Sequence, residues 1–246
     1  MKIYIISIVT FIFAINSCFQ FYDSRDPFEV GGNLNSAKII LIGEEHGVGW
    51  ILDKQFETWH HYYVNEGLRH LFIEVGYFTA QYYNLWMRSD NDDIFDILFE
   101  DLKGSPAYNT VNYEFYKRLK RECPETIFHG TDVGHQYWST GERFLNYLQE
   151  IGLQDTEQYN LTLEAIEQGK YFYDNNANEY RENMMAQNFI REFDNIGNTK
   201  IIGFYGSSHT NFNKNGFYGR YPNMANQLRS HYGDIIYFEN YRYSRW

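Results

Sequence analysis

Four short apolar runs, each leading into acidic residues or histidines, constrain the fold of this 246-residue chain more than any other feature. The runs cover residues 38–42, 70–73, 126–128 and 200–205. Continuous apolar runs of this length are typical of strands buried on both faces, as in parallel sheets. A further strand is predicted over residues 234–238.

The segments between these runs carry apolar residues at helical spacing. Helices are predicted over residues 50–65, 79–88, 92–102, 113–121, 142–151, 156–168, 178–193 and 224–231. Alternation of strands and helices indicates an α/β fold with a mostly parallel central sheet flanked by helices. The long inserts after the second and third strands are expected to form a helical cap over one end of the sheet. A single domain is predicted over residues 37–246.

The first 17 residues are typical of a signal peptide. Their apolar run, Ile3–Ile15, is too short to span a membrane. The serine before Cys18 resembles a relaxed lipobox, so we expect Cys18 to be lipidated and residues 18–36 to form a tether; a plain secretory signal cleaved nearby is the alternative. Lipidation of Cys18 would leave Cys123 alone, so no intrachain disulfide is expected. The domain is therefore expected to be lipid-anchored in a bacterial cell envelope, outside the cytoplasm.

The charge balance restricts the class of partner. With 32 acidic and 21 basic residues, the net charge is −11. Binding to nucleic acid requires a basic face, so a nucleic-acid partner is excluded. Aromatic residues make up 20% of the chain, including 23 tyrosines, so the walls of any pocket are expected to be aromatic. The expected partners are a small-molecule substrate or ligand, and the membrane through the lipid.

Polar residues follow all four apolar runs. In open α/β sheets, ligands bind beyond the carboxyl ends of the strands, so residues after different strands should meet at one edge. The residues placed there are Glu44, Glu45, His46, Glu74, His129, Asp132 and His209. This convergence predicts a functional site at that edge.

His46 is the candidate base of this site. It lies just before a predicted helix, whose N-terminus disfavours the imidazolium ion and helps to keep the ring neutral. A neutral imidazole can accept a proton from water or bind a metal. Glu44 and Glu45 point in opposite directions in an extended segment, and we favour Glu44 for the site. Glu74 follows a buried strand, so its carboxylate must be paired; it could orient His46 or hold water or a metal.

The other candidates carry alternatives of their own. His209 follows three small residues that allow close approach of a ligand. Arg181 could reach an anionic group in the cleft, or pair at the surface with a neighbouring glutamate. His129 is interpreted mainly as a structural residue. The predicted catalytic residues are His46, Glu44, Glu74 and His209. The predicted substrate-binding residues are Arg181, Asp132, Glu45 and Tyr173. No metal is required; if a metal is bound, its predicted ligands are His46, His209 and Glu74.

Taken in order, these motifs resemble a known superfamily. The segments are Gly43-Glu44-Glu45-His46-Gly47, Glu74, Gly130-Thr131-Asp132, residues 181–188 and Gly206-Ser207-Ser208-His209. Their order is similar to that in the erythromycin esterase-like and ChaN-like superfamily, over roughly residues 38–238. Residues 224–229 are similar to the end of the esterase-like branch. The ordered set is specific for a fold and a site, but not for a substrate.

The resemblance implies several activities. Erythromycin esterases open a macrolide lactone with water, using a histidine base and acidic helpers without a required metal. By motif position, His46 would be that base, Glu44 and Glu74 would position it, and His209 would assist near the oxyanion or leaving group. Arg181 would lie at the cleft wall. ChaN is a haem-binding lipoprotein, and Tiki-type members are metal-dependent peptidases.

Two departures affect the choice among these activities. The spacing from Glu44 to His46 is shorter than in the esterases and closer to ChaN, and the chain is too short for a typical macrolide esterase. Both departures argue against a macrolide substrate. Because Glu44, His46, Glu74 and His209 converge on one edge of the sheet, we favour a metal-independent hydrolase of an ester or lactone with no cofactor. The alternatives are a ChaN-like lipoprotein that binds haem, with Tyr or His as iron ligands, and a hydrolase that uses a divalent metal. A degenerate member kept for an envelope interaction is the least favoured.

Overall fold

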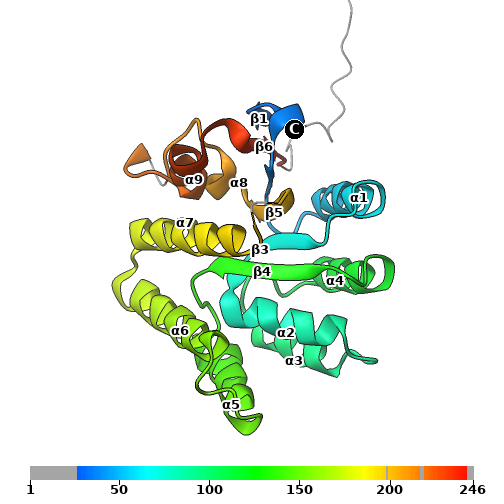
Figure 1. Ribbon diagram of the computed structural model, residues 1–246, viewed down its shortest axis with the longest axis vertical. Coiled ribbons are helices and arrows are strands. Elements are labelled where there is room, and N and C mark those ends of the chain that lie inside the picture. Colours follow the sequence, from blue (N-terminus) through cyan, green and yellow to red (C-terminus); the bar gives the residue numbers. More distant parts are fainter. Residues whose placement is uncertain (1–26, 198, 217–218, 243–246) are drawn as a thin grey trace, which may run out of the picture.

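One sheet organises the chain, which is described by a computed structural model over residues 27–197, 199–216 and 219–242 (Figure 1). Its strands lie in the order β1-β6-β2-β5-β3-β4. The strands from β6 to β4 run parallel, and β1 pairs antiparallel with β6. The strand bounds are β1 Glu29–Gly31, β2 Ile39–Glu44, β3 His70–Gly76, β4 Ile127–Asp132, β5 Ile201–Gly206 and β6 Ile236–Asn240. The predicted α/β fold with a mostly parallel sheet is confirmed.

Helices cover both faces of this sheet (Figure 1). The α-helices are α1 Gly49–Asn65, α2 Tyr77–Met87, α3 Asp93–Asp101, α4 Thr110–Glu122, α5 Glu142–Glu150, α6 Glu157–Asn175, α7 Asn178–Asn195, α8 Ser207–Thr210 and α9 Met224–Tyr232. Short turns of other helical types are η1 Leu34–Ser36, η2 Tyr137–Gly141 and η4 Gly233–Ile235. The sheet residues Ile40 and Ile42 pack in the core that contains α1, α2 and α4, whereas Ile39 and Leu41 pack with α7 and α9. Alternate residues of β2 are thus buried on opposite faces, which explains its unbroken apolar run.

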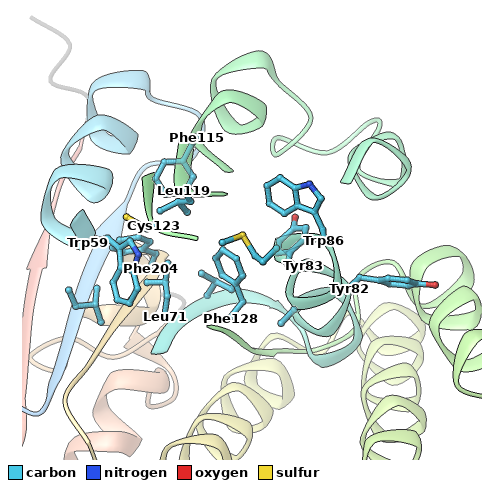
Figure 2. Close-up of a cluster of buried hydrophobic side chains, with 14 of the residues drawn as sticks. Trp59, Leu71, Tyr82, Tyr83, Trp86, Phe115, Leu119, Cys123, Phe128 and Phe204 are labelled. Atoms are coloured by element: carbon cyan, nitrogen blue, oxygen red, sulfur yellow. The ribbon is translucent and has the colours of Figure 1, made fainter. Parts of the chain in front are cut away.

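The larger core is strongly aromatic (Figure 2). The ring of Tyr83 lies 4.8 Å from that of Tyr116 and 5.6 Å from that of Phe128. Phe115 of α4 and Phe204 of β5 meet at 6.2 Å, at the end of this core nearest the carboxyl ends of the strands. Cys123 is a free, fully buried thiol of the same core, and burial raises its pKa to about 11.

The two inserts after β3 and β4 supply the cap. The first contains α2, α3 and α4, and the second contains η2, α5 and α6. Helix α6 ends at Asn176, whose φ of 47° turns the chain into α7. Helix α7 then runs back over β4, and its Phe189 ring lies 6.3 Å from that of Tyr205 in β5. Its first turn lies close to the carboxyl ends of the strands.

The predicted tether is wrong in its last part. Residues 29–31 form β1, and the carboxylate of Glu29 accepts a hydrogen bond from Nδ2 of Asn211 at 2.8 Å. Three residues of alternating exposure carry no apolar run, so the sequence did not reveal this strand. The predicted signal peptide, Cys18 and the start of the tether lie outside the described residues. Within the described part of the chain, every helix is too short or too polar to cross a membrane.

Candidate functional site

A cavity of about 370 Å³ lies at the carboxyl ends of β2, β3 and β4. One side is formed by these strand ends and α7, and the other by α1, α2, α4 and the segment 102–107. Its volume is within the range of small-molecule sites. Six of the eight predicted site residues line it, namely Glu44, His46, Glu74, Asp132, Tyr173 and Arg181.

Glu44 and His46 form a hydrogen-bonded pair at the end of β2. Nδ1 of His46 lies 2.7 Å from Oε1 of Glu44, and the His46 side chain is 47% exposed. The hydrogen bond to Glu44, together with the charge of Glu74, raises the pKa of His46 to about 9 although partial burial opposes this. The expectation that the helix N-terminus keeps this ring neutral is therefore wrong. A carboxylate in direct contact outweighs a helix terminus that begins three residues later.

Glu74, near the end of β3, is held by three donors. Its Oε1 accepts from Nη2 of Arg181 at 2.6 Å and lies 3.4 Å from Nε2 of His209. Its Oε2 accepts from the backbone N–H of Gly206. Burial disfavours the charged form, but His209 and Arg181 hold the pKa of Glu74 well below its usual range. Glu74 is therefore a fixed anion at neutral pH.

Gly206 lets His46 and Glu74 approach one another. A Cβ atom on residue 206 would lie 3.1 Å from Nε2 of His46 and 3.3 Å from Oε2 of Glu74. The second nitrogen of the His46 ring and the Glu74 carboxylate thus face one small space in front of Gly206. Any other residue at position 206 would occupy that space.

His209 lies behind Glu74 and does not line the cavity. It is 6% exposed, and its Nδ1 lies 2.7 Å from Oε1 of Glu182. The other oxygen of Glu182 accepts a hydrogen bond from the backbone N–H of Met224, at the start of α9. Burial opposes the charge on His209, but Glu74 and Glu182 raise its pKa to about 10. His209 is therefore an imidazolium ion between two carboxylates.

The sequence did not single out Glu182 as part of the site. Glu182 is one of the neighbouring glutamates expected to pair with Arg181 at the surface, but its side chain is buried and reaches His209. Neighbouring residues on a helix point about 100° apart, so Arg181 faces β3 and β4 while Glu182 faces α8 and α9.

Arg181 also binds Asp132 at the end of β4. Its Nε donates to Oδ1 at 2.9 Å and its Nη2 to Oδ2 at 2.5 Å. Asp132 is fully buried, and the positive charge of Arg181 holds its pKa well below the usual range against the effect of burial. Arg181 thus bridges the carboxylates of Glu74 and Asp132.

A second histidine of the cavity, His135, was missed by the sequence analysis. Its Nε2 lies 2.8 Å from Oδ2 of Asp132, and its Nδ1 lies 2.8 Å from the hydroxyl of Tyr173. The intervening Gly134 packs so tightly that a Cβ there would lie 2.4 Å from the carbonyl oxygen of Ala165. An acid and a histidine three residues apart, separated by a glycine after a buried strand, are the signal that could have revealed it.

Two further candidates from the sequence, Glu45 and His129, lie outside the cavity, as His209 does. Glu45 is exposed and does not line it. His129 lies inside β4, where its ring stacks on Phe72 at 4.7 Å. Its ring nitrogens contact His70 and Glu192, each at 2.9 Å. This agrees with a structural role for His129.

The alternative metal set is not assembled. Among the residues that the structure describes, no group of three or more histidine, cysteine, aspartate or glutamate side chains is arranged to hold a metal ion. In the proposed set of His46, His209 and Glu74, the last two form an ion pair with each other. The second nitrogen of His209 is taken by Glu182.

No family model and no curated protein matches the sequence. Several solved structures are similar to the chain. A mutant of the erythromycin esterase EreC in its open conformation has a TM-score of 0.61 at 12% identity, over 82% of this chain and 69% of that one. A protein from Bacillus cereus has a TM-score of 0.60 at 12% identity, over 82% of this chain and 64% of that one.

A further structure, described as a succinoglycan biosynthesis protein, has a TM-score of 0.59 at 13% identity, over 82% of this chain and 64% of that one. The chain therefore spans less than two thirds of the length of two of these proteins. At such low identity the likeness concerns the fold. The chain has the α/β fold of the erythromycin esterase EreC, as the order of motifs in its sequence predicted.

Proposed function

We propose that the protein is a hydrolase that cleaves an ester or lactone with a water molecule activated by His46. The observation that carries this proposal is the Glu44–His46 pair, whose free ring nitrogen shares the space in front of Gly206 with Glu74. The similarity of the fold to an erythromycin esterase supports the same class of reaction. The volume of the cavity, about 370 Å³, favours a substrate much smaller than a macrolide.

In the first step, neutral His46 accepts a proton from water at Nε2 while the water oxygen attacks the carbonyl carbon. Glu44 retains its hydrogen bond to Nδ1 and stabilises the imidazolium that forms. Glu74 would hold the water from the other side, since its Oε2 faces the same space. Because the pKa of His46 is about 9, this step is faster at alkaline pH.

Arg181 would stabilise the oxyanion. Its hydrogen bonds to Glu74 and Asp132 use Nε and Nη2, and the side chain lines the cavity. The Nη1 group can therefore donate to the carbonyl oxygen as negative charge develops on it. Collapse of the tetrahedral intermediate breaks the bond to the leaving oxygen, which takes the proton from His46. The products are a carboxylic acid and an alcohol, joined in one molecule when the substrate is a lactone.

We also propose that a lipid on Cys18 holds the domain at the cell envelope. The support is the apolar run of residues 3–15 followed by Ser17 and Cys18. Expression of the full chain in a bacterium, with labelled palmitate and membrane fractionation, tests this. Loss of both label and membrane association in Cys18→Ala would support it, and retention of both would refute it.

Hydrolysis itself is tested with a panel of 4-nitrophenyl esters and small lactones. The purified wild-type protein is compared with the variant His46→Asn. Turnover that falls at least about 100-fold in His46→Asn is expected for the loss of a general base. Equal turnover by both proteins would overturn the proposal. Titration with haemin on the same sample checks the haem-binding alternative, which a saturable, shifted Soret band would favour.

A further inference from the structure

The cavity has a part that the proposed chemistry does not use. The charged and titratable side chains with an acid or base function that line the cavity are Glu44, His46, Glu74, Asp132, His135 and Arg181, which come from the strand ends, the segments just after them and α7. Away from them, the wall between α1, α2 and α4 is neutral. We call this part the neutral arm; its residues include Leu52, Gln55, Tyr83, Ser105, Phe115 and Tyr116.

Two polar groups in the neutral arm have no hydrogen-bond partner among the described residues. They are Nε2 of Gln55 and Oγ of Ser105, and both atoms are buried. Gln55 is only 1% exposed, because it lies on the same buried face of α1 as Leu52 and Phe56. Native proteins rarely leave a buried amide donor without a partner, because its lost contact with water is not replaced. Tyr83 and Tyr116, in contrast, hydrogen-bond to each other in the same wall.

We propose that the neutral arm binds the apolar part of the substrate, and that Gln55 recognises an oxygen atom within it. A carbonyl, ether or hydroxyl oxygen would accept a hydrogen bond from Nε2 of Gln55, with Ser105 as a second polar contact. The inference rests on the proposed ester hydrolysis and specifies its substrate class: a compact, uncharged ester or lactone with an additional oxygen in its apolar part.

The surroundings of the arm support each element of this class. The arm itself contains neither a cation nor a carboxylate, so a charged group of either sign would lose its water there without gaining a counter-ion. The aromatic rings of Tyr83, Phe115 and Tyr116 suit apolar matter. The whole cavity, about 370 Å³, lies at the small end of the range for small-molecule sites, which favours a compact substrate.

Gln55→Leu is the informative variant, because it keeps the approximate size of the side chain and removes its donor. The matched control is Thr79→Val. The hydroxyl of Thr79 is also buried and has no hydrogen-bond partner in the described part of the chain, but Thr79 does not line the cavity. Neither Nε2 of Gln55 nor Oγ1 of Thr79 has a hydrogen-bond partner among the described residues, so both variants are expected to fold, and thermal melting checks this. Gln55→Met serves as a second variant if Gln55→Leu does not fold.

The experiment compares 4-nitrophenyl alkanoates with oxo-alkanoates of the same chain length, in which one ketone is moved along the chain. At the ketone position that reaches Gln55, wild type should prefer the oxo ester by about 2- to 13-fold in kcat/KM, as one net hydrogen bond gives. Gln55→Leu should abolish that preference, and Thr79→Val should keep it. Absence of a preference at every position, or its survival in Gln55→Leu and Gln55→Met, would overturn the inference.

A binding measurement separates this inference from the proposed function. The same acyl pairs are prepared as 4-nitroanilides and titrated by calorimetry into His46→Asn, which removes the proposed base. Tighter binding of the oxo anilide that is lost on adding Gln55→Leu supports the arm assignment even if no ester is hydrolysed. Turnover of esters without any oxo preference supports the hydrolase and refutes the role of Gln55.

Discussion

Oε1 of Glu44 lies 2.7 Å from Nδ1 of His46, which places the other ring nitrogen of His46 at the space in front of Gly206. The carboxylate therefore fixes both the orientation of the ring and its proton affinity. A raised pKa makes the ring a stronger base, but it also keeps a larger fraction protonated at neutral pH.

The first prediction concerns the pH profile. His46 acts only when deprotonated, so kcat/KM should rise with pH through an apparent pKa of about 9. In Glu44→Gln the neutral amide no longer favours the imidazolium. The rise of kcat/KM should therefore occur at lower pH, and the maximum value that kcat/KM reaches at high pH should fall. Steady-state kinetics between pH 6 and about 10.5 measures both effects. The control is Glu45→Gln, which changes an exposed neighbour outside the cavity; an unchanged limb in Glu44→Gln would contradict the role of the pair.

The second prediction treats His209 as a positioning residue that acts through Glu74. Replacing it by glutamine removes a positive charge 3.4 Å from Oε1 of Glu74, so the pKa of Glu74 should rise. We expect kcat to fall by about 10- to 100-fold with little change in KM, and a new acidic limb in the pH profile. Glu182→Gln should act in the same direction. His231→Gln changes an exposed histidine and should do neither; a loss of kcat without any change of the pH profile would indicate a merely structural role.

The third prediction concerns the space in front of Gly206. Gly206 has φ −56°, which any residue can adopt, so Gly206→Ala should fold normally. Its Cβ would lie 3.1 Å from Nε2 of His46 and displace the attacking water. We expect a loss of kcat of about 100-fold at unchanged melting temperature. In the control Gly49→Ala, the new Cβ meets Val111 at an ordinary 3.5 Å. Full activity in Gly206→Ala would show that water is activated elsewhere.

The fourth prediction is a dependence of stability on pH. Asp132 is fully buried beside Arg181, and removing one partner of such a pair costs about 3–5 kcal/mol. Because the folded pKa of Asp132 is depressed, its stabilisation is complete above the unfolded pKa near 3.8 and is lost as pH falls below it. The gap in free energy of unfolding between wild type and Asp132→Asn should therefore be largest at pH 7 and narrow at pH 3. Urea unfolding measures it, with the exposed Asp155→Asn as control; a constant gap would contradict the linkage.

The regular elements were predictable because their burial leaves a period in the sequence. Strand β2 alternates between two cores, and α7 places Met185, Phe189 and Phe193 in one of them. The strand β1 was missed, since three edge residues carry no such period. Topology also made part of the site predictable: parallel strands bring Glu44, Glu74 and Asp132 to one edge whatever their loops do.

The rest of the site depends on contacts that a linear sequence does not encode. His135 enters only because the chain after β4 turns back on Asp132. Gln55 looks like any polar helix residue until its face is known to be buried. The predicted neutral state of His46 was wrong, because the proton affinity of the ring depends on a 2.7 Å contact with Glu44 rather than on proximity to a helix end.

The three donors to Glu74 come from residues far along the chain. Arg181 and Gly206 lie 107 and 132 positions after it. His209 is held in turn by Glu182 of α7, which also accepts a hydrogen bond from the first residue of α9. A chain still emerging from the ribosome would therefore present this carboxylate without its counter-charges, and a buried, uncompensated charge opposes closure of the core. Assembly of the candidate site therefore has to wait for the segment up to residue 209, and a product truncated before Gly206 would lack two of the three donors to Glu74.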